Sequence, residues 1–289
     1  MNTTVGRLLD EAARNLLVAN ADLVETRREA QILFGHAMGV SRAWLSAHRD
    51  DAADPATADT FRELVRRRRA GEPVAYLVGS REFYGLEFRV TADVLIPRAD
   101  TETLVDAALE KLPKGAQSDV LDLGTGSGCV ALAIAHERHE VRLTAVDISA
   151  AALCVARENA ASIGVSAEFV QGVWFDGLDG RRFDLIVSNP PYVATGDPHL
   201  QQGDLRFEPA TALASGTDGL ADIRTIVAHA PGYLREGGWF LFEHGHDQAD
   251  ACRDLLHDAG FSDVIRRTDI AGLPRVAGGR LLTSKSPTR

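Results

Sequence analysis

The chain has 289 residues, of which 45% are hydrophobic and 25% charged, and its formal net charge is −10. This is the composition of a soluble globular protein with core enough for one large or two moderate domains. No apolar run approaches the roughly 20 residues that a membrane span needs, and no secretion signal is visible at the N-terminus. Three cysteines without a C-x-x-C spacing predict a cytoplasmic protein with neither a disulfide framework nor a zinc site.

The negative charge is unevenly distributed. Residues 1–75 hold 11 basic and 11 acidic side chains, so the whole deficit lies in residues 76–289. Duplex DNA is therefore disfavoured as a direct substrate, because its binding relies on a basic surface.

Residues 1–75 are predicted to form a helical domain. Apolar side chains recur at helical spacing in three stretches, within residues 5–17, 30–38 and 61–65. The run Arg66 to Arg69 closes the last helix. Two interpretations stay open for it: a cationic last turn that offsets the helix dipole, or a contact for an RNA-associated partner.

Residues 76–97 are predicted to form a β-hairpin that links two domains. Residues 82–90 and 94–96 alternate like strands around a turn at Thr91-Ala92-Asp93, and Pro97-Arg98 ends the second strand. A helix is expected from Asp100 or Thr101.

Residues 98–289 are predicted to form an α/β domain. Strands are expected at 120–123, 141–146, 167–171, 183–187 and 239–242, with two more closing the chain, and helices at 129–136, 150–163, 220–234 and 248–259. Such alternation indicates a mostly parallel sheet with helices on both faces.

A glycine-rich loop follows the first of these strands and opens a helix. Its residues are Gly124, Thr125, Gly126, Ser127 and Gly128, and Asp147 ends the next strand, where a carboxylate suits ribose hydroxyls. A dinucleotide and S-adenosylmethionine compete as ligands. Asp122, ahead of the first glycine, would repel a pyrophosphate but could bind the cationic amino group of a methionine moiety. The dinucleotide pattern G-x-G-x-x-G/A requires glycine or alanine at position 129, where this chain has Cys129. We therefore favour S-adenosylmethionine, and we read Cys129 as a small buried hydrophobic residue.

The second motif is Asn189-Pro190-Pro191-Tyr192, at the end of the strand 183–187. Each proline fixes its own φ and biases the preceding residue toward extended backbone, so Asn189 is held at a strand's C-terminal end, where ligands bind in open α/β sheets. An amide presents one acceptor and two donors, which suits a planar nitrogen-bearing group. His244 and His246 lack a convincing third ligand, so no metal is expected.

Several further motifs occur in fixed order with these two. They are Glu72-Pro73-x-x-Tyr76-x-x-Gly79, Phe83-Tyr84-Gly85, Leu95-Ile96-Pro97-Arg98-x-x-Thr101-Glu102, His199-Leu200-x-x-Gly203-Asp204-x-Arg206-Phe207-Glu208-Pro209, Glu243-His244-Gly245 and Asp269-x-x-Gly272-x-x-Arg275. Together they resemble the peptide chain release factor glutamine N5-methyltransferase family, to about Arg280.

The resemblance implies a Rossmann-like methyltransferase with a seven-stranded sheet and a small N-terminal helical substrate-recognition domain. It implies methyl transfer from S-adenosylmethionine, leaving S-adenosylhomocysteine, to the glutamine amide of a release factor's Gly-Gly-Gln loop, and so a role in translation termination. The implied partner is the release factor, with no membrane and no metal.

The resemblance also assigns residues. Gly124 to Gly128, Asp147, Trp174 and Asn189 would bind the cofactor, and Asn189, Pro190, Pro191 and Tyr192 the glutamine, with Asn189, Pro190 and Tyr192 catalytic. Apart from the resemblance, Arg98, Thr101 and Glu102 are predicted to border the cofactor because they lie at the junction between the hairpin and the following helix. His199, Arg206 and Glu208 would line the substrate pocket, or Arg206 and Glu208 would form a buried ion pair. Val173 departs from the family, which usually has an acid there, and Asp176 lies nearby.

Two other functions compete with this one. A nucleic-acid amino-methyltransferase could use the same tetrapeptide on a base flipped into the pocket. A sensor could bind the cofactor without catalysis, although it would have no need of Asn189 to Tyr192.

Overall fold

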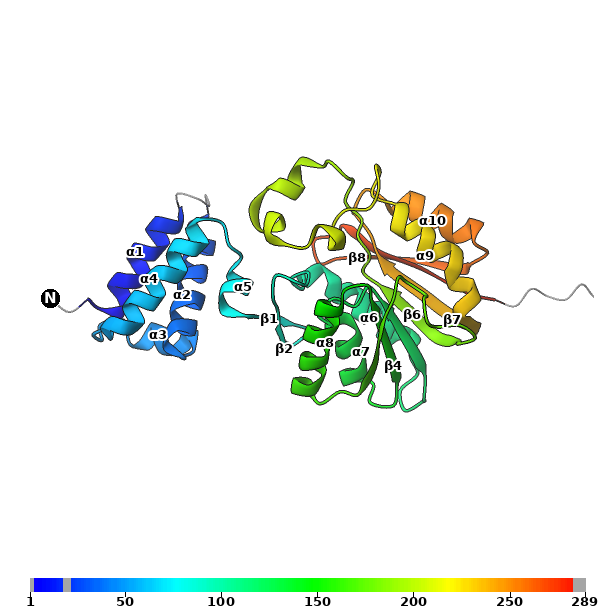
Figure 1. Cartoon of the computed structure of the whole chain (residues 1–289), viewed down its shortest axis with the longest axis horizontal. Coiled ribbons are helices and arrows are strands. Elements are labelled where there is room, and N and C mark those ends of the chain that lie inside the picture. The colour runs from blue at the N-terminus through cyan, green and yellow to red at the C-terminus, as the bar shows by residue number, and fades with distance from the viewer. Residues whose placement is uncertain (1–2, 18–21, 283–289) are drawn as a thin grey trace, which may run out of the picture. The chain divides into compact units, whose positions relative to one another are not determined.

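The computed structural model describes residues 3–17 and 22–282, which separate into two compact units. The first unit runs to Ser80 and also contains Gln202–Phe207, and the second holds Arg81–Gln201 and the chain from Glu208 onward (Figure 1). Within these described ranges, no helix is long and apolar enough to cross a membrane.

The first unit is built from amphipathic helices (Figure 1). Asp22 caps the second helix through its side chain, and Gly39 ends it in the left-handed conformation that glycine adopts without strain. The apolar faces of the helices in this unit share one core, in which the centroids of the Phe34 and Phe61 rings lie 4.8 Å apart in an edge-to-face arrangement. The helices are α1 (Val5–Leu17), α2 (Leu23–Met38), α3 (Arg42–Ala47), α4 (Pro55–Arg69) and α5 (Val74–Val78).

Three of the four arginines at the end of α4 are engaged in ion pairs. Arg66 pairs with Glu63, Arg67 with Glu72, and the largely buried Arg68 bridges Glu29 and Asp204. Both Arg68 contacts measure 2.7 Å, so this side chain joins two helices and the inserted segment 202–207 into one unit.

A two-stranded hairpin, β1 (Ser80–Phe83) and β2 (Leu86–Arg89), follows α5, which itself continues past residue 75. The hairpin is present, and a turn does occur at residues 91–93, but that turn follows β2 and does not join the two strands of the hairpin. The chain reverses at Tyr84 and Gly85, whose φ angles of 54° and 74° are those of the tight turns that match strand twist. Residues 94–96 are not a strand; Val94 and Ile96 are buried in irregular backbone.

The second unit contains a seven-stranded sheet in the order β5-β4-β3-β6-β7-β9-β8. The five strands from β5 to β7 are parallel, and β9 runs antiparallel to both β7 and β8. The predicted fold class is confirmed. The strands are β3 (Asp119–Leu123), β4 (Arg142–Asp147), β5 (Ala167–Gln171), β6 (Phe183–Ser188), β7 (Leu234–Glu243), β8 (Ser262–Thr268) and β9 (Pro274–Arg280).

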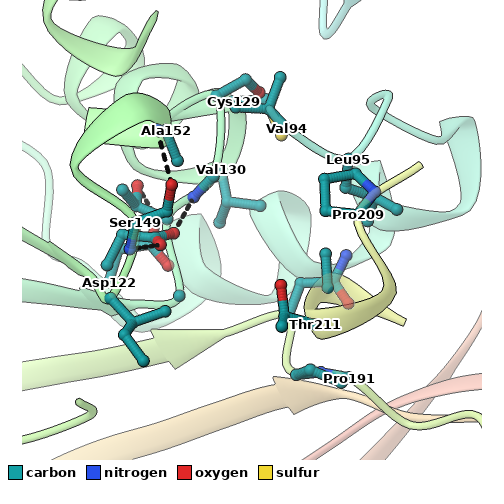
Figure 2. Close-up of a pocket in the computed structure, with 18 of the residues that line it drawn as sticks. Val94, Leu95, Asp122, Cys129, Val130, Ser149, Ala152, Pro191, Pro209 and Thr211 are labelled. Atoms are coloured by element: carbon teal, nitrogen blue, oxygen red, sulfur yellow. Dashed lines mark hydrogen bonds between the residues drawn. The ribbon is translucent and has the colours of Figure 1, made fainter. Parts of the chain in front are cut away.

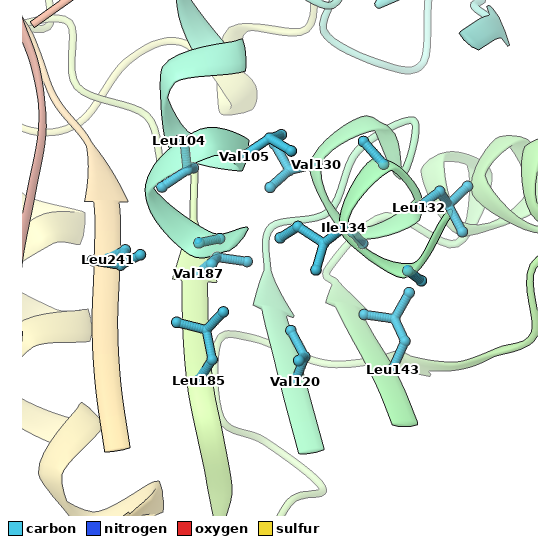
Figure 3. Packing of buried hydrophobic residues seen from close by; sticks show 14 of the residues in the cluster. Leu104, Val105, Val120, Val130, Leu132, Ile134, Leu143, Leu185, Val187 and Leu241 are labelled. Carbon is cyan, nitrogen blue, oxygen red and sulfur yellow. The ribbon is translucent and has the colours of Figure 1, made fainter. Parts of the chain in front are cut away.

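Helices cover both faces of the sheet because alternate strand residues point to opposite sides. One face packs under α6 (Glu102–Lys111) and α7 (Cys129–Glu137), where Val120, Leu143, Leu185 and Val187 meet Leu104 and Ile134 (Figure 3). The other face packs under α9 (Ala221–His229) and α10 (Ala249–Asp258). α8 (Ala150–Ile163) connects β4 to β5, and 3-10 turns occur at 99–101, 198–201, 203–207, 210–212 and 230–233.

Strand β7 begins at Leu234, earlier than the predicted residue 239. Pro231 and Gly232 end the predicted helix 220–234 early, in a 3-10 turn. The sequence Gly237-Gly238 is typical of a turn, but the pair lies within the strand. Next to it, the pairing of β7 with β6 shifts register between Phe183 and Leu185. Glycines in a strand often mark such bulges.

Candidate active site

A cavity of about 250 Å³ lies in the second unit, at the carboxyl ends of β3, β4 and β6 (Figure 2). The chain passes from β3 to β4 on one side and returns to β6 on the other, so this is the point where the strand order reverses. Open α/β sheets bind their ligands at such points. The lining comes from four segments, 93–101, 122–130, 147–152 and 172–174, together with Asn189, Pro191, Pro209, Thr211, Ala212 and Asp222.

The glycine loop forms one wall of the cavity and is held by backbone hydrogen bonds. The amides of Gly124 and Thr125 both donate to the Val146 carbonyl, and the amide of Gly126 donates to Asp147 Oδ2 at 2.8 Å. Gly124 and Gly126 have φ angles of 72° and 56°, which residues with a Cβ adopt only with strain. Their backbone is therefore exposed to a ligand without intervening side chains.

Asn159 fastens this loop to the hairpin. Its fully buried side chain accepts from the Arg89 amide at 2.7 Å and donates to the carbonyls of Arg89 and Ser127 at 3.0 and 2.9 Å. Both N–H groups and the carbonyl oxygen of its amide are thus engaged between β2 and the glycine loop. The sequence analysis missed this residue, which has no motif of its own within α8.

Asp122 is a buried acid in the cavity wall. Burial raises its pKa to about 7, the nearby Asp147 carboxylate adds to this effect, and a 2.6 Å hydrogen bond from the Thr125 hydroxyl opposes it. Ser127 Oγ is buried beside it and has no hydrogen-bond partner within the described part of the chain. This end of the cavity therefore holds polar groups that a cationic or hydrogen-bonding ligand would satisfy.

Asp147 has its carboxylate divided between two backbone amides. Oδ2 accepts from Gly126 and Oδ1 accepts from Ser149 at 2.8 Å. Asp147 lines the cavity together with the exposed Ile148. Because it also accepts the hydrogen bond from Gly126, the acid that was predicted to face the ligand also stabilises the glycine loop. This second role of Asp147 was not predicted.

Trp174 and Val173 line the cavity beside the glycine loop. The Trp174 ring lies so close to Gly124 that a Cβ there would be 3.3 Å from it, and Trp174 itself has a φ of 52°. Val173 is 47% exposed. The Asp176 carboxylate accepts from the Val173 amide at 3.3 Å and does not line the cavity.

Asn189 reaches the cavity from the end of β6. Its Nδ2 donates to Thr101 Oγ1 at 3.3 Å, and Pro191 lines the cavity next to it. Tyr192 points elsewhere: its hydroxyl donates to Glu243 Oε1 at 2.9 Å, at the end of the neighbouring strand β7. Glu243 is buried, which raises its pKa, while hydrogen bonds from Thr101 and Tyr192 and the charge of Arg275 oppose the shift.

The opposite wall of the cavity is largely apolar, and its apolar residues were not predicted, although Glu208 was predicted to shape a pocket wall and Arg98 and Thr101 to border the cofactor. Figure 2 shows Leu95, Pro209 and Thr211 across from Asp122 and Ser149. The Glu208 carboxylate holds this wall in place, because it accepts from the Ile96 amide at 3.0 Å and from Arg98. The sequence motifs predicted a pocket role for Glu208, but they do not indicate that it contacts Ile96 and Arg98, which are more than 100 residues earlier in the chain.

Most of the remaining predicted residues do not line the cavity. Gly128, Pro190 and Tyr192 do not line it themselves, and Glu102 accepts from the Tyr84 amide. His199 is exposed and bonds to Asp197. Cys129 begins α7 and packs against the hydrophobic core as predicted, but it is only partly buried and also lines the cavity. Among described side chains, no three His, Cys, Asp or Glu residues are grouped as metal ligands.

Two protein-family models match this chain. The Methyltransferase small domain family matches residues 100–213, and the PrmC N-terminal domain family matches residues 7–79. The chain is similar to the crystal structure of a methyltransferase from Pyrococcus furiosus, with a TM-score of 0.51, 16% identity, and coverage of 77% of this chain and 98% of that one. That likeness concerns the fold alone.

Two sequence relatives extend over nearly the whole chain. The release factor glutamine methyltransferase of Xylella fastidiosa (strain 9a5c) is 50% identical over 92% of this chain and 96% of its own length. The protein of the same name from Vibrio cholerae is 44% identical over 99% of both chains. The chain therefore belongs to the release factor glutamine methyltransferase family.

Proposed function

We propose that this protein transfers a methyl group from S-adenosylmethionine to the side-chain amide of the glutamine in the Gly-Gly-Gln loop of peptide chain release factors. The observation that carries the proposal is that Asn189 and the glycine loop line one cavity. The residue that binds the substrate and the loop that binds the cofactor must line the same cavity if a methyl group is to pass from the cofactor to the substrate. The relatives named for this activity supply the substrate class.

The residues at one end of the cavity fit S-adenosylmethionine. Asp122 offers a carboxylate to the cationic amino group, Asp147 offers acceptors to ribose hydroxyls, and the unpartnered Ser127 hydroxyl is free to bond a ligand. Trp174 provides a flat apolar surface of the kind that an adenine ring packs against. The bound cofactor would supply a methyl group already activated by its attachment to a sulfonium.

The protein's part is to position the acceptor nitrogen. An amide nitrogen is a poor nucleophile because its lone pair is delocalised into the carbonyl group. Asn189 Oδ1 and the Pro190 carbonyl would accept hydrogen bonds from the two N–H groups, which raises electron density on nitrogen and fixes its direction. Placement of two reactants at reaction distance can supply several kcal/mol of the barrier reduction. The proton leaves to water after transfer, so the step requires no strong base.

The geometry favours this acceptor over a nucleic-acid base. The wall opposite the cofactor end consists of Leu95, Pro97, Pro209 and Thr211. The basic residue in the cavity lining is Arg98, which is paired with Glu208, so the lining forms no basic groove for a phosphate backbone. The acidic excess of residues 76–289 would repel a phosphate backbone.

One transfer assay tests the proposal. Purified protein and labelled S-adenosylmethionine are incubated with release factor, with its Gln→Ala loop variant, or with DNA. Label is expected in the intact release factor alone. Label in DNA, or label that survives the Gln→Ala change, would reject the assignment, and absence of any transfer would favour the sensor.

The role of Asn189 is tested in the same assay. Asn189→Ala is expected to lower kcat about 100-fold or more, in the range for loss of one preorganised hydrogen-bonding group, while S-adenosylhomocysteine still binds. Gln201→Ala, an exposed change in the following loop, serves as control. Unchanged turnover in Asn189→Ala would refute the role given to Asn189.

A further inference from the structure

Residues 189–192, here called the acceptor loop, are held in place by a side chain that belongs to none of the sequence motifs. Gln248 lies just before α10, in the loop that follows β7. Its Nε2 donates to the Tyr192 carbonyl at 3.0 Å, and its Oε1 accepts from the Gly245 amide at 2.8 Å. One side-chain amide therefore joins the backbone of the acceptor loop to the backbone that follows β7.

The orientation of the Gln248 amide follows from the chemistry of its partners. A backbone N–H group only donates and a backbone carbonyl only accepts, so the oxygen must face Gly245 and the nitrogen must face Tyr192. Nε2 also lies 3.4 Å from the Asp218 carbonyl, which gives its second N–H group an acceptor. A side chain of the same shape without N–H groups could keep the contact with Gly245 but not the contact with Tyr192.

The Tyr192 carbonyl is closely packed at this point. A Cβ on Gly219 would lie 2.3 Å from the Tyr192 oxygen and 2.7 Å from Gln248 Nε2, so only glycine leaves room for the hydrogen bond. Gly219 also has a φ of 75°, which glycine adopts without strain. The carbonyl is therefore confined between the Gln248 side chain and the backbone of residues 218–219.

The acceptor loop is fixed at both ends and is stiff between them. Ser188, the last residue of β6, anchors its start by pairing with β3 and β7. Tyr192 anchors its end, because its hydroxyl is bonded to Glu243 and its carbonyl to Gln248. The two prolines between these anchors have fixed φ angles and leave few ways to absorb a displacement. Since Pro191 lines the cavity directly before Tyr192, a shift of the Tyr192 carbonyl would be passed to the cavity wall.

We propose that Gln248 is a positioning residue for methyl transfer, which sets the location of the acceptor loop through the Tyr192 carbonyl. Gln248 does not line the cavity, so it acts on the reaction through this loop and not by contact with either ligand. The inference rests on the proposed function, because the loop carries Asn189 Oδ1 and the Pro190 carbonyl, the two proposed acceptors for the glutamine N–H groups. A misplacement of about 1 Å between reacting groups can cost about 100-fold in rate.

Gln248→Glu tests the donor because it replaces only the NH₂ group of the side chain. The introduced carboxylate can still accept from Gly245, but it turns an oxygen toward the Tyr192 carbonyl, and the two repel each other. At pH 8 we expect kcat to fall at least about 10-fold. The dissociation constant for S-adenosylhomocysteine is expected to stay within about threefold of the wild type, because the glycine loop is unchanged. Gln201→Glu, the same change at an exposed position, is the matched control and is expected to leave kcat unchanged.

The pH dependence of this variant separates positioning from a general loss of structure. When the introduced carboxyl group is protonated, its O–H can donate to the Tyr192 carbonyl as Nε2 does. The ratio of variant kcat to wild-type kcat is therefore expected to rise severalfold as the pH falls from about 8 to about 5.5. Asp218 and Asp247 in the surrounding loops and Glu243 beside Tyr192 are present in both proteins, so their titration does not produce this trend. A constant ratio over this range, or wild-type kcat at pH 8, would overturn the proposal.

Gly219→Ala displaces the same carbonyl from the other side while Gln248 stays intact. We expect kcat to fall at least about 10-fold here as well, but without recovery at low pH, because no donor is restored. Gly196→Ala is the matched control: its φ of 91° imposes the same kind of backbone strain, but no atom of the described chain lies within 4 Å of its Cβ position. Equal kcat in the two glycine variants would show that the Tyr192 carbonyl need not be held in place, and would reject the proposal.

Crystal structures keep the inference separate from the choice of substrate. In crystals of Gln248→Glu at pH 8, residues 189–192 are expected to be displaced from their wild-type position, and at about pH 5.5 they are expected to return to it. This comparison can be made even if release factor is not methylated, in which case the proposed function fails by itself. An acceptor loop that keeps its wild-type position at pH 8 would rule out Gln248 as a positioning residue.

Discussion

Asp122 is a cavity residue whose pKa lies near neutral pH. Burial outweighs the hydrogen bond from Thr125, so the pKa of this carboxyl group is raised to about 7, far above its ordinary value. A cation bound beside it would favour the charged form and release a proton. Cofactor affinity and pH are therefore coupled through this one side chain.

We expect S-adenosylhomocysteine to bind more weakly as the pH falls from 8 to 6. Below a pKa of about 7 the free protein carries a proton on Asp122, which must be removed on binding, so affinity falls by up to about tenfold per pH unit. Calorimetric titration across this range measures the slope, and Asp122→Asn is expected to flatten it. 5′-Methylthioadenosine, which lacks the amino group, is the control ligand; an equal slope for both ligands would contradict the role of Asp122.

Gly124 is the position where a single methyl group would disturb the cofactor end of the cavity. A Cβ there would stand 3.3 Å from the Trp174 ring, and the φ of 72° adds strain of about 1–2 kcal/mol for any residue but glycine. Gly124→Ala is expected to weaken S-adenosylhomocysteine binding about tenfold.

Gly115→Ala provides the matched control for this change. Gly115 has a similar φ of 74° but nothing within 4 Å of its Cβ position, so it carries the backbone strain without the contact. Binding titrations of both variants separate the two effects. Equal affinity in the two variants would mean that the Trp174 contact is not important.

At the scale of elements, the strand edge opposite the cavity is held by charges. Asp119 begins β3 and its carboxylate accepts from Arg142 of β4 and Arg235 of β7, while Asp184 of β6 also pairs with Arg235. The hydrogen bond from Arg142 is the largest cause that lowers the pKa of Asp119 to about 2. These pairs join four neighbouring strands at their amino ends.

Asp119→Asn is expected to lower the free energy of unfolding by about 1 kcal/mol at pH 7, because the pKa of Asp119 is lowered but its arginine partners are largely exposed to solvent. Because the folded-state pKa is depressed, this stabilisation is present above about pH 4 and is lost as the pH falls from 4 toward 2. Urea unfolding at several pH values should show wild type and variant converging at acid pH. A difference that stays constant down to pH 2.5 would exclude the ionic origin, and exposed Asp179→Asn is the control.

The elements also show how far the sequence could lead. Short apolar runs that alternate with helical segments along the chain correctly predicted the seven-stranded α/β sheet. Strands of such a sheet are continuous apolar runs because both of their faces are buried. The hairpin turn at Tyr84-Gly85 was missed because its strands are only four residues long, too short for alternation to fix a register. The cavity wall of Leu95, Pro209 and Thr211 depends on Glu208 reaching 112 residues back to Ile96, a contact that no local pattern encodes.

At the scale of the whole molecule, the first unit is not one continuous stretch of chain. Residues 202–207, far beyond Ser80 in sequence, belong to it through Asp204 with Arg68 and through Arg206 with the Ala70 carbonyl. The predicted domains at 1–75, 76–97 and 98–289 stay predictions. A continuous division of this kind cannot represent an inserted segment, because sequence order does not report contacts between distant residues.

We expect Asp204→Asn to destabilise helices α2 and α4, although position 204 is distant from them in sequence. Arg68 would keep Glu29 but lose its second partner, at a cost of about 1 kcal/mol for a partly exposed pair. Hydrogen exchange followed by mass spectrometry would locate the faster exchange in peptides of α2 and α4. Asp50→Asn, an exposed change in the same unit, is the control, and equal exchange in both variants would contradict the inserted segment's role.

The buried amide of Asn159 has a consequence for how the cofactor loop acquires its shape. The glycine loop is completed by a side chain 32 residues later and by a strand residue, Arg89, that precedes it. A peptide spanning only β3, the loop and α7 lacks both, so it would not retain the loop's conformation. The conformation of the loop therefore depends on contacts from α8 and the hairpin as well as on β4, so cofactor binding reports on the assembly of several distant segments of the second unit.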